Sequence, residues 1–446
     1  MPDHTIEEQE EEIAALTKVV AAFENYERDA YSANNRRRKD AHRIPLADRE
    51  LLAKLGFQDK LVEVDKCIAV NAQFARDIVA HTGIFGDAGD EIPDPDEEDE
   101  EGEDDDVHDH ELGDEDDEED SNDDEHHGHD HGHSHQHSHG HGHSHSHSHS
   151  APSHSHSHSH AHPHSHASPQ PQQSKPTEHD MEKVRSTIKQ FVRDWSDEGK
   201  PERDQCYKPM LDALLERYKD VPDSERGDIR VLVPGAGLAR LAFDVAKLGF
   251  ASQGNEFSHY MLFASHFILN RTRKIHQHTI YPFIHSFSNL RRREDLLKAV
   301  TIPDVLPSDI LGRDFSLVAG DFEEVYGDES AESEPQHGPW DAILTCFFLD
   351  TAKNIVNYLR IIHRILKPGG IWINLGEGPL LWHFENNTSN DISIELDMSE
   401  MMKLLDMVGF EITSQRTIPT TYATTLEGML SYVYSAEFWT AKKKTA

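Results

Sequence analysis

Residues 229–248 read Ile-Arg-Val-Leu-Val-Pro-Gly-Ala-Gly-Leu-Ala-Arg-Leu-Ala-Phe-Asp-Val-Ala-Lys-Leu. The β-branched run at 229–233 is typical of a buried strand. The turn at 234–237 follows it, and apolar residues at three- and four-residue steps from Leu238 to Leu248 predict an amphipathic helix. A strand, a glycine turn and a helix form the first unit of a nucleotide-binding α/β fold, in which the glycines let a ligand approach the backbone.

Outward from this unit, the same alternation of helix and strand continues. We expect further strands at 251–255, 315–319, 340–346 and 371–375, with a helix at 355–366. Three acidic residues follow three of these strands: Glu256, Asp321 and Asp350. Ligands of parallel sheets bind beyond the carboxyl ends of the strands. Gly235 and these three carboxylates should therefore line one crevice, with Glu256 placed to accept hydrogen bonds from ribose hydroxyls.

The whole chain of 446 residues divides by composition into three parts. Residues 1–86 show helical periodicity, with Pro45 separating two helices. Residues 87–178 hold an acidic block, a histidine tract and a Pro/Gln/Ser stretch, and contain too little apolar surface to offset chain entropy, so we expect disorder. Residues 179–446 form the α/β domain, with a mostly parallel sheet.

Charge and cysteine content exclude several classes of protein. Between Asp87 and Glu125 there are 26 acidic and no basic side chains, so the rest of the chain carries about −14 of the formal −40. A negative globular part argues against nucleic-acid binding. We see no apolar run long enough for a membrane span and no signal peptide. Three cysteines predict no disulfide framework and a reducing compartment, cytoplasmic or also nuclear.

The histidine tract from His126 to His166 offers a competing function. It holds 20 of the 34 histidines, many as His-Ser-His or His-Gly-His. Alternate residues of an extended chain point the same way, so pairs of them could hold Zn²⁺ or Ni²⁺ loosely. No set of four ligands at defined spacing is present, and we predict a solvated spacer with no dedicated metal site.

The glycine turn alone does not identify a ligand, because many α/β proteins use one simply to reverse the chain. The dinucleotide fingerprint requires a third small residue where this chain has Arg240. S-adenosylmethionine has no pyrophosphate and does not need that residue. The segment Leu366–Gly370 also resembles the turn before the fifth strand of class I methyltransferases, which favours S-adenosylmethionine as the cofactor.

Five segments together resemble the carnosine N-methyltransferase family, and two of them, Gln-Gly-Asn-Glu and Thr-Cys-Phe-Phe, are unusual among methyltransferases. The segments are 231–241, 253–258, 319–322, 345–351 and 383–386. The likeness extends to the helices around Ala21 to Thr82 and to Lys189–Ser196. It implies a Rossmann-like class I methyltransferase fold with a mostly parallel seven-stranded sheet. Ala239 departs from an expected glycine, and we expect the departure to cost little because it falls within the start of the helix.

The resemblance also implies roles for individual residues. It assigns S-adenosylmethionine binding to Gln190, Arg193, Gly235, Glu256, Asp321, Phe322 and Cys346. Arg193 would hold the methionine carboxylate, since an arginine fork suits that group, and Asp321 and Phe322 would hold the adenine. Without the family, Arg193 is better explained as a surface charge, and Cys346 as a small buried hydrophobe.

The implied acceptor is an imidazole, which needs orientation more than deprotonation at pH 7, because its unperturbed pKa is near ~6.5. Asp350 is the candidate to hold one ring N–H and aim the other nitrogen at the methyl group. His383 and Tyr434 are candidates to bind the substrate, with Tyr422 a poorer choice. The alternatives are an N-cap role for Asp350, an ordinary loop histidine, and core tyrosines in a strand containing Tyr432 and Tyr434.

We therefore expect an enzyme that methylates carnosine, giving anserine, or a related histidyl peptide. A metal-buffering or interaction protein that works through the insert is the alternative from another class. A methyltransferase of protein histidines on the same fold is a third possibility. The sequence leaves open whether the chain forms a homodimer.

Overall fold

The computed structural model describes residues 6–80, 175–327, 338–376, 392, 394–424 and 428–444. All of these residues belong to one compact unit. The predicted insert, apart from its last four residues (175–178), lies outside them, as does His383. Within these ranges no helix is both long and apolar enough to cross a membrane. In the same ranges no three His, Cys, Asp or Glu side chains are grouped to hold a metal ion.

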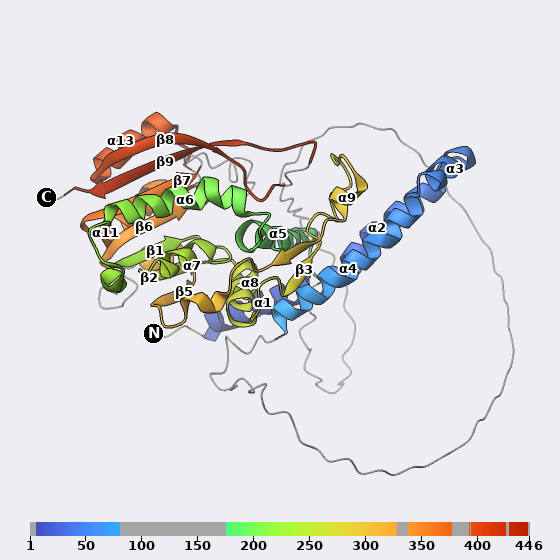
Figure 1. Cartoon of the computed structure of the whole chain (residues 1–446), viewed down its shortest axis with the longest axis horizontal. Helices are drawn as coiled ribbons and strands as arrows, with labels where there is room; N and C mark the ends of the chain where they lie inside the picture. Colours follow the sequence, from blue (N-terminus) through green and yellow to red (C-terminus); the bar gives the residue numbers. More distant parts are fainter. Residues whose placement is uncertain are drawn as a thin grey trace, which may run out of the picture. The chain divides into compact units, whose positions relative to one another are not determined.

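A seven-stranded sheet forms the centre of the α/β domain (Figure 1). Its order is β5-β2-β1-β6-β7-β9-β8, and β9 alone runs antiparallel, against both neighbours. The strands are β1 Arg230–Pro234, β2 Ala251–Glu256, β5 Phe315–Ala319, β6 Trp340–Cys346, β7 Leu366–Gly376, β8 Phe410–Thr420 and β9 Tyr434–Lys443. The mostly parallel, seven-stranded sheet of a class I methyltransferase is thus confirmed, and β5 and β6 have the bounds that the sequence predicts.

Helices cover both faces of this sheet, because side chains of successive strand residues point to opposite faces. Val231 and Val233 pack under α6 and α7, whereas Leu232 faces the layer of α10, α11 and α13. The helices are α6 Lys200–Arg217, α7 Arg240–Lys247, α10 Phe322–Gly327, α11 Ile355–Ile365 and α13 Met398–Val408. This three-layer arrangement fixes the carboxyl ends of the parallel strands along one edge of the sheet.

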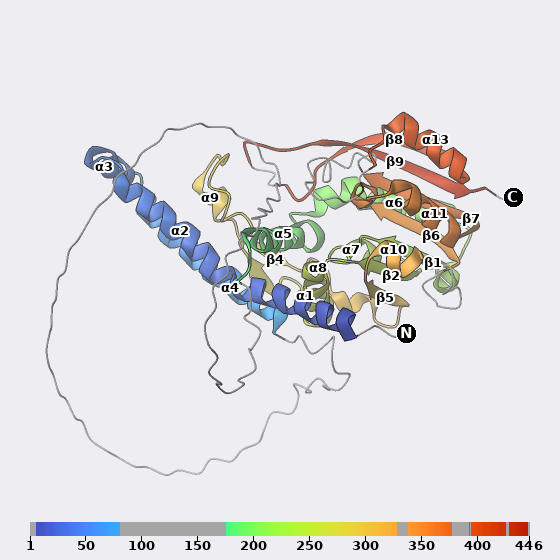
Figure 2. The same cartoon turned by 180° about the vertical axis from the view of Figure 1, so that it is seen from behind.

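The N-terminal helices share a core with the α/β domain. Their buried side chains pack in one apolar cluster with those of α5, α8 and the antiparallel pair of β3 and β4. Figures 1 and 2 show α2 and α4 running side by side. The elements are α1 Ile6–Glu24, α2 Tyr26–Arg43, α3 Leu46–Lys54, α4 Phe57–Val79, α5 Glu178–Trp195, α8 His259–Asn270, β3 His278–Ile280, α9 Arg293–Leu296 and β4 Val300–Ile302.

Four N-terminal helices replace the two that the periodicity predicts. Pro45 precedes α3, as expected, but two further breaks occur, at Asn25 and at Gly56. Gly56 has φ +67, a left-handed conformation that glycine adopts at little cost, and it ends α3 and turns the chain into α4. The α3 segment buries no side chain, so exposed Leu51 within it and exposed Leu55, its C-cap, extend the helical pattern without contributing to the core.

Candidate active site

The pocket at the centre of the sheet edge lies where the strand order reverses. From β1 the order continues through β2 and β5 on one side and through β6 and β7 on the other. Ligands of open α/β sheets bind at this switch point. The pocket is lined by Gln190, Arg193, Tyr207, Val233, Pro234, Gly235, Ala236, Gly237, Leu241, Cys346, Phe347 and Tyr422. Four of the predicted cofactor residues, Gln190, Arg193, Gly235 and Cys346, therefore meet in one cavity.

The glycine turn, residues 234–237, lines this pocket, which is the crevice that the sequence predicts. Gly235 has φ +65 and Gly237 has φ +56, both in the left-handed region. A Cβ atom on Gly235 would lie 2.7 Å from the Phe348 ring, whereas one on Gly237 would lie 3.9 Å from the nearest side chains, Asp194 and Gln190. Gly235 is thus required both by backbone conformation and by space.

Ala239 was expected to be a harmless departure inside a helix, and that expectation is wrong. The residue precedes α7 as its N-cap, with φ +63. An L-residue in the left-handed region costs roughly 1–2 kcal/mol relative to the right-handed one. A glycine at this position would avoid that cost, which explains physically why the turn favours one.

Glu256, the last residue of β2, binds the backbone of the glycine turn through its side chain. One carboxylate oxygen accepts the Gly237 N–H at 2.7 Å, and the other accepts the N–H groups of Phe257 at 3.0 Å and Ser258 at 2.8 Å. Burial raises the pKa of Glu256, and these three hydrogen bonds oppose the rise. The carboxylate therefore shapes the glycine turn itself and retains acceptor capacity for a ligand hydroxyl.

Arg193 is a buried cation, so the alternative of an ordinary surface charge is excluded. Its Nε lies 2.8 Å from Glu202 Oε1. Its guanidinium carbon lies over the rings of Tyr207 and Tyr422, 4.9 and 4.5 Å from their centroids. Burial opposes the charge, but Tyr207, Asp194 and further neighbours outweigh it and hold the pKa of Arg193 above its usual range. The crevice thus contains a fixed positive charge.

Asp194 organises the residues around this cation. Its carboxylate accepts hydrogen bonds from Tyr207 Oη at 2.8 Å and from Gln190 Nε2 at 3.2 Å, and lies 3.6 Å from Arg193 Nη1. The sequence reasoning missed Asp194, Glu202 and Tyr207. Asp194 could have been found from its helical spacing to Gln190, one turn earlier, whereas Glu202 and Tyr207 come from α6 and give no signal in the sequence.

Asp321 and Phe322 follow β5, next to the end of β2. Asp321 Oδ1 accepts the Glu323 N–H at 2.7 Å and so caps α10. The buried ring of Phe322 packs against Phe348, with centroids 5.2 Å apart, and Phe348 is the ring that approaches Gly235. These contacts connect the end of β5 to the glycine turn.

Cys346 ends β6 on the opposite side of the crevice, and Phe347 follows it. Burial raises the pKa of the Cys346 thiol, so it stays protonated, and its sulfur lies 3.9 Å from Arg193 Nη2. Phe347 has φ +50, which is strained for a non-glycine residue. Its ring packs edge-on against the rings of Tyr422 and Tyr434, with centroids 5.1 and 5.7 Å apart. Phe347 was not predicted as a site residue, yet it joins the two candidate tyrosines.

Asp350 is buried in a short 3₁₀ turn, Leu349–Thr351, immediately after this strained segment. The alternative that it caps the following helix is excluded, because Asn354 is the N-cap of α11 and its side chain accepts the Asn357 N–H. Tyr434 begins β9 and is half-buried. Tyr432 was expected in the same strand but precedes it and is exposed, so that expectation is wrong.

Comparison with the sequences of known proteins gives one consistent result. Residues 170–445 match the family model described as carnosine N-methyltransferase. A carnosine N-methyltransferase of Mus musculus is 46% identical over 269 residues, which cover 59% of this chain and 64% of that protein. One of Schizosaccharomyces pombe is 45% identical over 273 residues, 59% of this chain and 71% of that protein. A solved S-adenosylmethionine-dependent methyltransferase of Methanosarcina mazei aligns at 13% identity over 52% of this chain and 98% of its own, with a TM-score of 0.33.

The chain thus spans just under two thirds of the mouse relative. The family match begins at residue 170, after the N-terminal helices, so it does not test the resemblance that we predict for them. It does include every candidate site residue, from Gln190 to Tyr434, and more than half of the chain. The chain belongs to the carnosine N-methyltransferase family.

Proposed function

We propose that this chain is an S-adenosylmethionine-dependent N-methyltransferase that methylates the imidazole of carnosine, giving anserine, or of a related histidyl peptide. Family membership supports the reaction, and the composition of the crevice supports the cofactor. The single observation that carries the proposal is the cluster of Arg193, Glu256 and Gly235 at the switch point of a class I methyltransferase sheet.

The residues of the crevice fit S-adenosylmethionine group by group. The buried guanidinium of Arg193 matches a carboxylate. Glu256 retains acceptor capacity for ribose hydroxyls, and Phe322 with Asp321 offers a ring and an acceptor for adenine. Gly235 leaves open the space that a Cβ would fill against Phe348. When bound, S-adenosylmethionine supplies a methyl group on a positively charged sulfur.

Asp350 is the residue that orients the imidazole, the group that accepts the methyl. A carboxylate that accepts one ring N–H fixes the tautomer of an imidazole and directs the lone pair of the other nitrogen. The ring becomes cationic as it gains the methyl group, so the negative charge of Asp350 stabilises the transition state more than the ground state. Phe347, Tyr422 and Tyr434 form an aromatic wall nearby, suited to one face of the ring and to the exclusion of water.

Mass spectrometry of the full-length chain incubated with S-adenosylmethionine and β-alanyl-histidine tests the proposal directly. We expect a product heavier by one methyl group, with fragmentation that places it on the imidazole. A chain that leaves histidyl dipeptides unmodified but methylates histidines of added proteins would overturn the choice of substrate. Failure to bind S-adenosylmethionine in calorimetry would overturn the choice of cofactor.

A further inference from the structure

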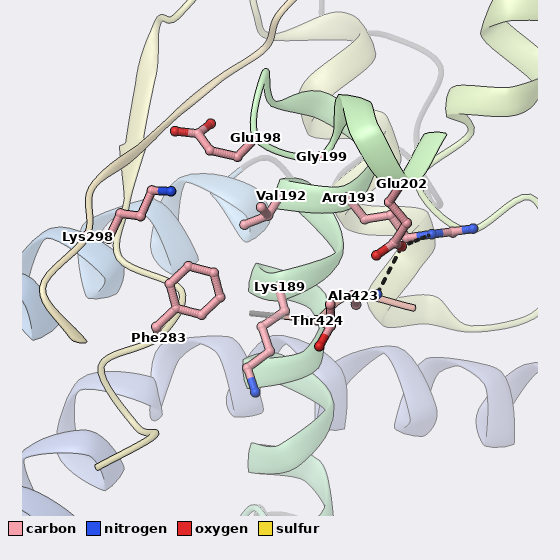
Figure 3. Close-up of a pocket in the computed structure, with 10 residues that line it drawn as sticks. All are labelled: Lys189, Val192, Arg193, Glu198, Gly199, Glu202, Phe283, Lys298, Ala423 and Thr424. Carbon is pink, nitrogen blue, oxygen red and sulfur yellow. Dashed lines mark hydrogen bonds and ion pairs between the residues drawn. The ribbon is translucent and has the colours of Figure 1, made fainter. Parts of the chain in front are cut away.

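The last turn of α5 is held in place through its backbone carbonyl groups. The final four carbonyls of an α-helix have no partner within the helix, and here each of the four accepts a hydrogen bond from elsewhere. The bonds run to Val192 O from Ser196 Oγ at 2.7 Å, to Arg193 O from Arg203 Nη1 at 2.7 Å, to Asp194 O from Arg240 Nη1 at 2.7 Å and to Trp195 O from the Asp304 N–H at 3.0 Å. Figure 3 shows this turn, with Arg193 next to Glu202 at the start of α6.

One carboxylate joins the two arginines that hold this turn. Asp304 follows β4, and its Oδ1 accepts Arg240 Nη1 at 2.5 Å while its Oδ2 accepts Arg240 Nη2 at 3.3 Å. Oδ2 also accepts Arg203 Nη2. The three side chains are only 6–7% exposed. Because buried polar networks whose members all have partners fix the groups that they join, Asp304, Arg203 and Arg240 form one unit, here called the arginine clamp.

The arginine clamp connects the two halves of the candidate cofactor site. Arg240 is the first residue of α7, directly after the glycine turn, whereas Arg203 belongs to α6 and holds the turn that carries Arg193. The two halves lie close together, since a Cβ on Gly237 would be 3.9 Å from Asp194 Oδ2. Arg240 stands where the dinucleotide fingerprint requires a small residue. The clamp gives that arginine a role: it ties the start of α7 to the end of α5.

We propose that Asp304 is a positioning residue for S-adenosylmethionine, which holds the glycine turn and Arg193 at the separation that the amino-acid part of the cofactor requires. Asp304 is not among the described residues that line the crevice, so it acts through Arg203 and Arg240. Arg193 matches the cofactor carboxylate, whereas Glu256 matches the ribose. Loss of Asp304 should therefore weaken the hold on the amino-acid part and spare the hold on the nucleoside. The inference rests on the proposed function and deepens it.

The experiment compares two ligands that share adenosine and its sulfur, S-adenosylhomocysteine and 5′-methylthioadenosine, of which only the first has an amino-acid part. Asp304→Asn replaces one carboxylate oxygen by an amide group that donates, so the two arginines lose their common counterion. We expect the affinity of the full-length chain for S-adenosylhomocysteine to fall about ten- to a hundredfold, with that for 5′-methylthioadenosine little changed. Calorimetry measures the first ligand, and competition against it measures the second.

Steady-state kinetics gives an independent readout of the same variant. With saturating β-alanyl-histidine, Asp304→Asn should raise the KM for S-adenosylmethionine and leave kcat at saturation little changed, because the clamp acts on binding of the cofactor. A role in general stability would not produce this split between the two constants.

Asp341→Asn is the matched control, because Asp341 also joins separate elements through a mostly buried carboxylate. It accepts the Arg230 N–H at 3.0 Å and Lys367 Nζ at 2.7 Å, at the opposite edge of the sheet, where β1 and β6 begin. The same substitution there should leave the affinity for both ligands at the wild-type value.

Arg203→Lys is the second test variant, and it decides the question if Asp304→Asn does not fold. Lysine keeps a cation beside Asp304 but lacks the planar fork that donates to the Arg193 and Ser196 carbonyls and to the carboxylate together. It should show the same selective loss of affinity for S-adenosylhomocysteine.

Wild-type affinity for S-adenosylhomocysteine in the folded variants would overturn the inference. So would an equal loss for both ligands, because that result describes a general disturbance of the crevice. A wild-type chain that binds neither ligand would overturn the proposed function, and this inference with it.

Discussion

At the scale of single residues, the candidate site is built from charges that are buried and compensated. Arg193 has Glu202 and Asp194 as counterions and two aromatic rings against its planar group. Glu256 has three backbone N–H donors. Each charge is thereby held in one position before a ligand arrives, which reduces the ordering cost of binding.

Glu256→Gln should weaken S-adenosylmethionine binding about ten- to a hundredfold, because a charge-assisted acceptor is lost. Burial raises the pKa of Glu256 above its usual 4.5, so the protonated form persists to higher pH in the folded protein. Its ionised form accepts hydroxyl donors better, so wild-type affinity should rise as the pH increases above 4.5. Calorimetry across this range should show that the S-adenosylmethionine affinity of Glu256→Gln depends less on pH than that of the wild type. An identical pH dependence would contradict the assignment of Glu256 as the ribose acceptor.

Asp350→Asn should lower kcat by roughly ten- to a hundredfold with little change in S-adenosylmethionine affinity. Asparagine keeps the shape and a carbonyl acceptor but removes the negative charge that stabilises the cationic ring. A capping role cannot account for such a loss, because Asn354 caps α11. Steady-state kinetics with saturating dipeptide measures the effect, and an Asn354→Ala variant, which should lose stability rather than kcat, serves as the control. Normal turnover of Asp350→Asn would remove Asp350 from the mechanism.

At the scale of elements, the ends of β1, β2, β5 and β6 position the site, and each end is tied to another element. The glycine turn is bound to Glu256, the end of β5 to Phe348 through Phe322, and α5 to α6 through Arg193 and Glu202. Because these ties cross between elements, a change in one of them should affect both ligand binding and stability.

Gly235→Ala should destabilise the fold and abolish measurable S-adenosylmethionine binding. The left-handed φ costs about 1–2 kcal/mol for alanine. In addition, the new methyl group meets the Phe348 ring at 2.7 Å. Gly312→Ala is the matched control, since Gly312 has φ +78 but no atom within 4 Å of its Cβ position. Denaturant unfolding should show a larger loss of free energy of unfolding for Gly235→Ala than for Gly312→Ala. Equal losses would mean that the Phe348 ring moves aside freely.

Asn71→Ala should lower the free energy of unfolding by roughly 2–4 kcal/mol, because it leaves several buried polar groups without a hydrogen-bond partner. The Asn71 amide accepts the Tyr281 N–H at 2.8 Å, donates to the Tyr281 carbonyl at 2.9 Å and donates to Tyr26 Oη at 3.0 Å. It therefore joins α4, α2 and the segment after β3. Gln73→Ala, on the exposed side of the same helix, should change stability little in chemical denaturation. A small effect of Asn71→Ala would show that its three hydrogen bonds contribute little to holding the N-terminal helices on the domain.

At the scale of the whole molecule, the described residues place the candidate site within a unit formed by both ends of the chain, with the N-terminal helices and the α/β domain sharing a core. None of the predicted site residues falls within the insert, residues 87–178. If the chain is an enzyme, the acidic and histidine-rich segments should not be needed for turnover.

Deletion of residues 87–174, replaced by a short Gly/Ser linker, should leave kcat, KM and S-adenosylmethionine affinity within about twofold of the wild-type values. Kinetics of the two chains side by side measures this, with zinc binding followed by calorimetry on the same samples. Loss of zinc binding with retained turnover is the expected result. Loss of turnover in a deletion variant that still unfolds cooperatively would favour the alternative in which the insert carries the function.

The sequence by itself determined five strands of the sheet, β1, β2, β5, β6 and β7, and the polar residues at their ends, since β-branched runs, glycine turns and helical periodicity are local signals. It did not predict β3, β4 or β8. The bounds of β5 and β6 and the place of Glu256 follow from such patterns. It did not determine the backbone of Ala239 and Phe347, the capping of α11 by Asn354, or the ion pair of Arg193 with Glu202. These depend on contacts between distant segments: whether Arg193 is a surface charge or a buried cation is decided by the packing of α5 against α6 and the segment containing Tyr422, which no local pattern encodes.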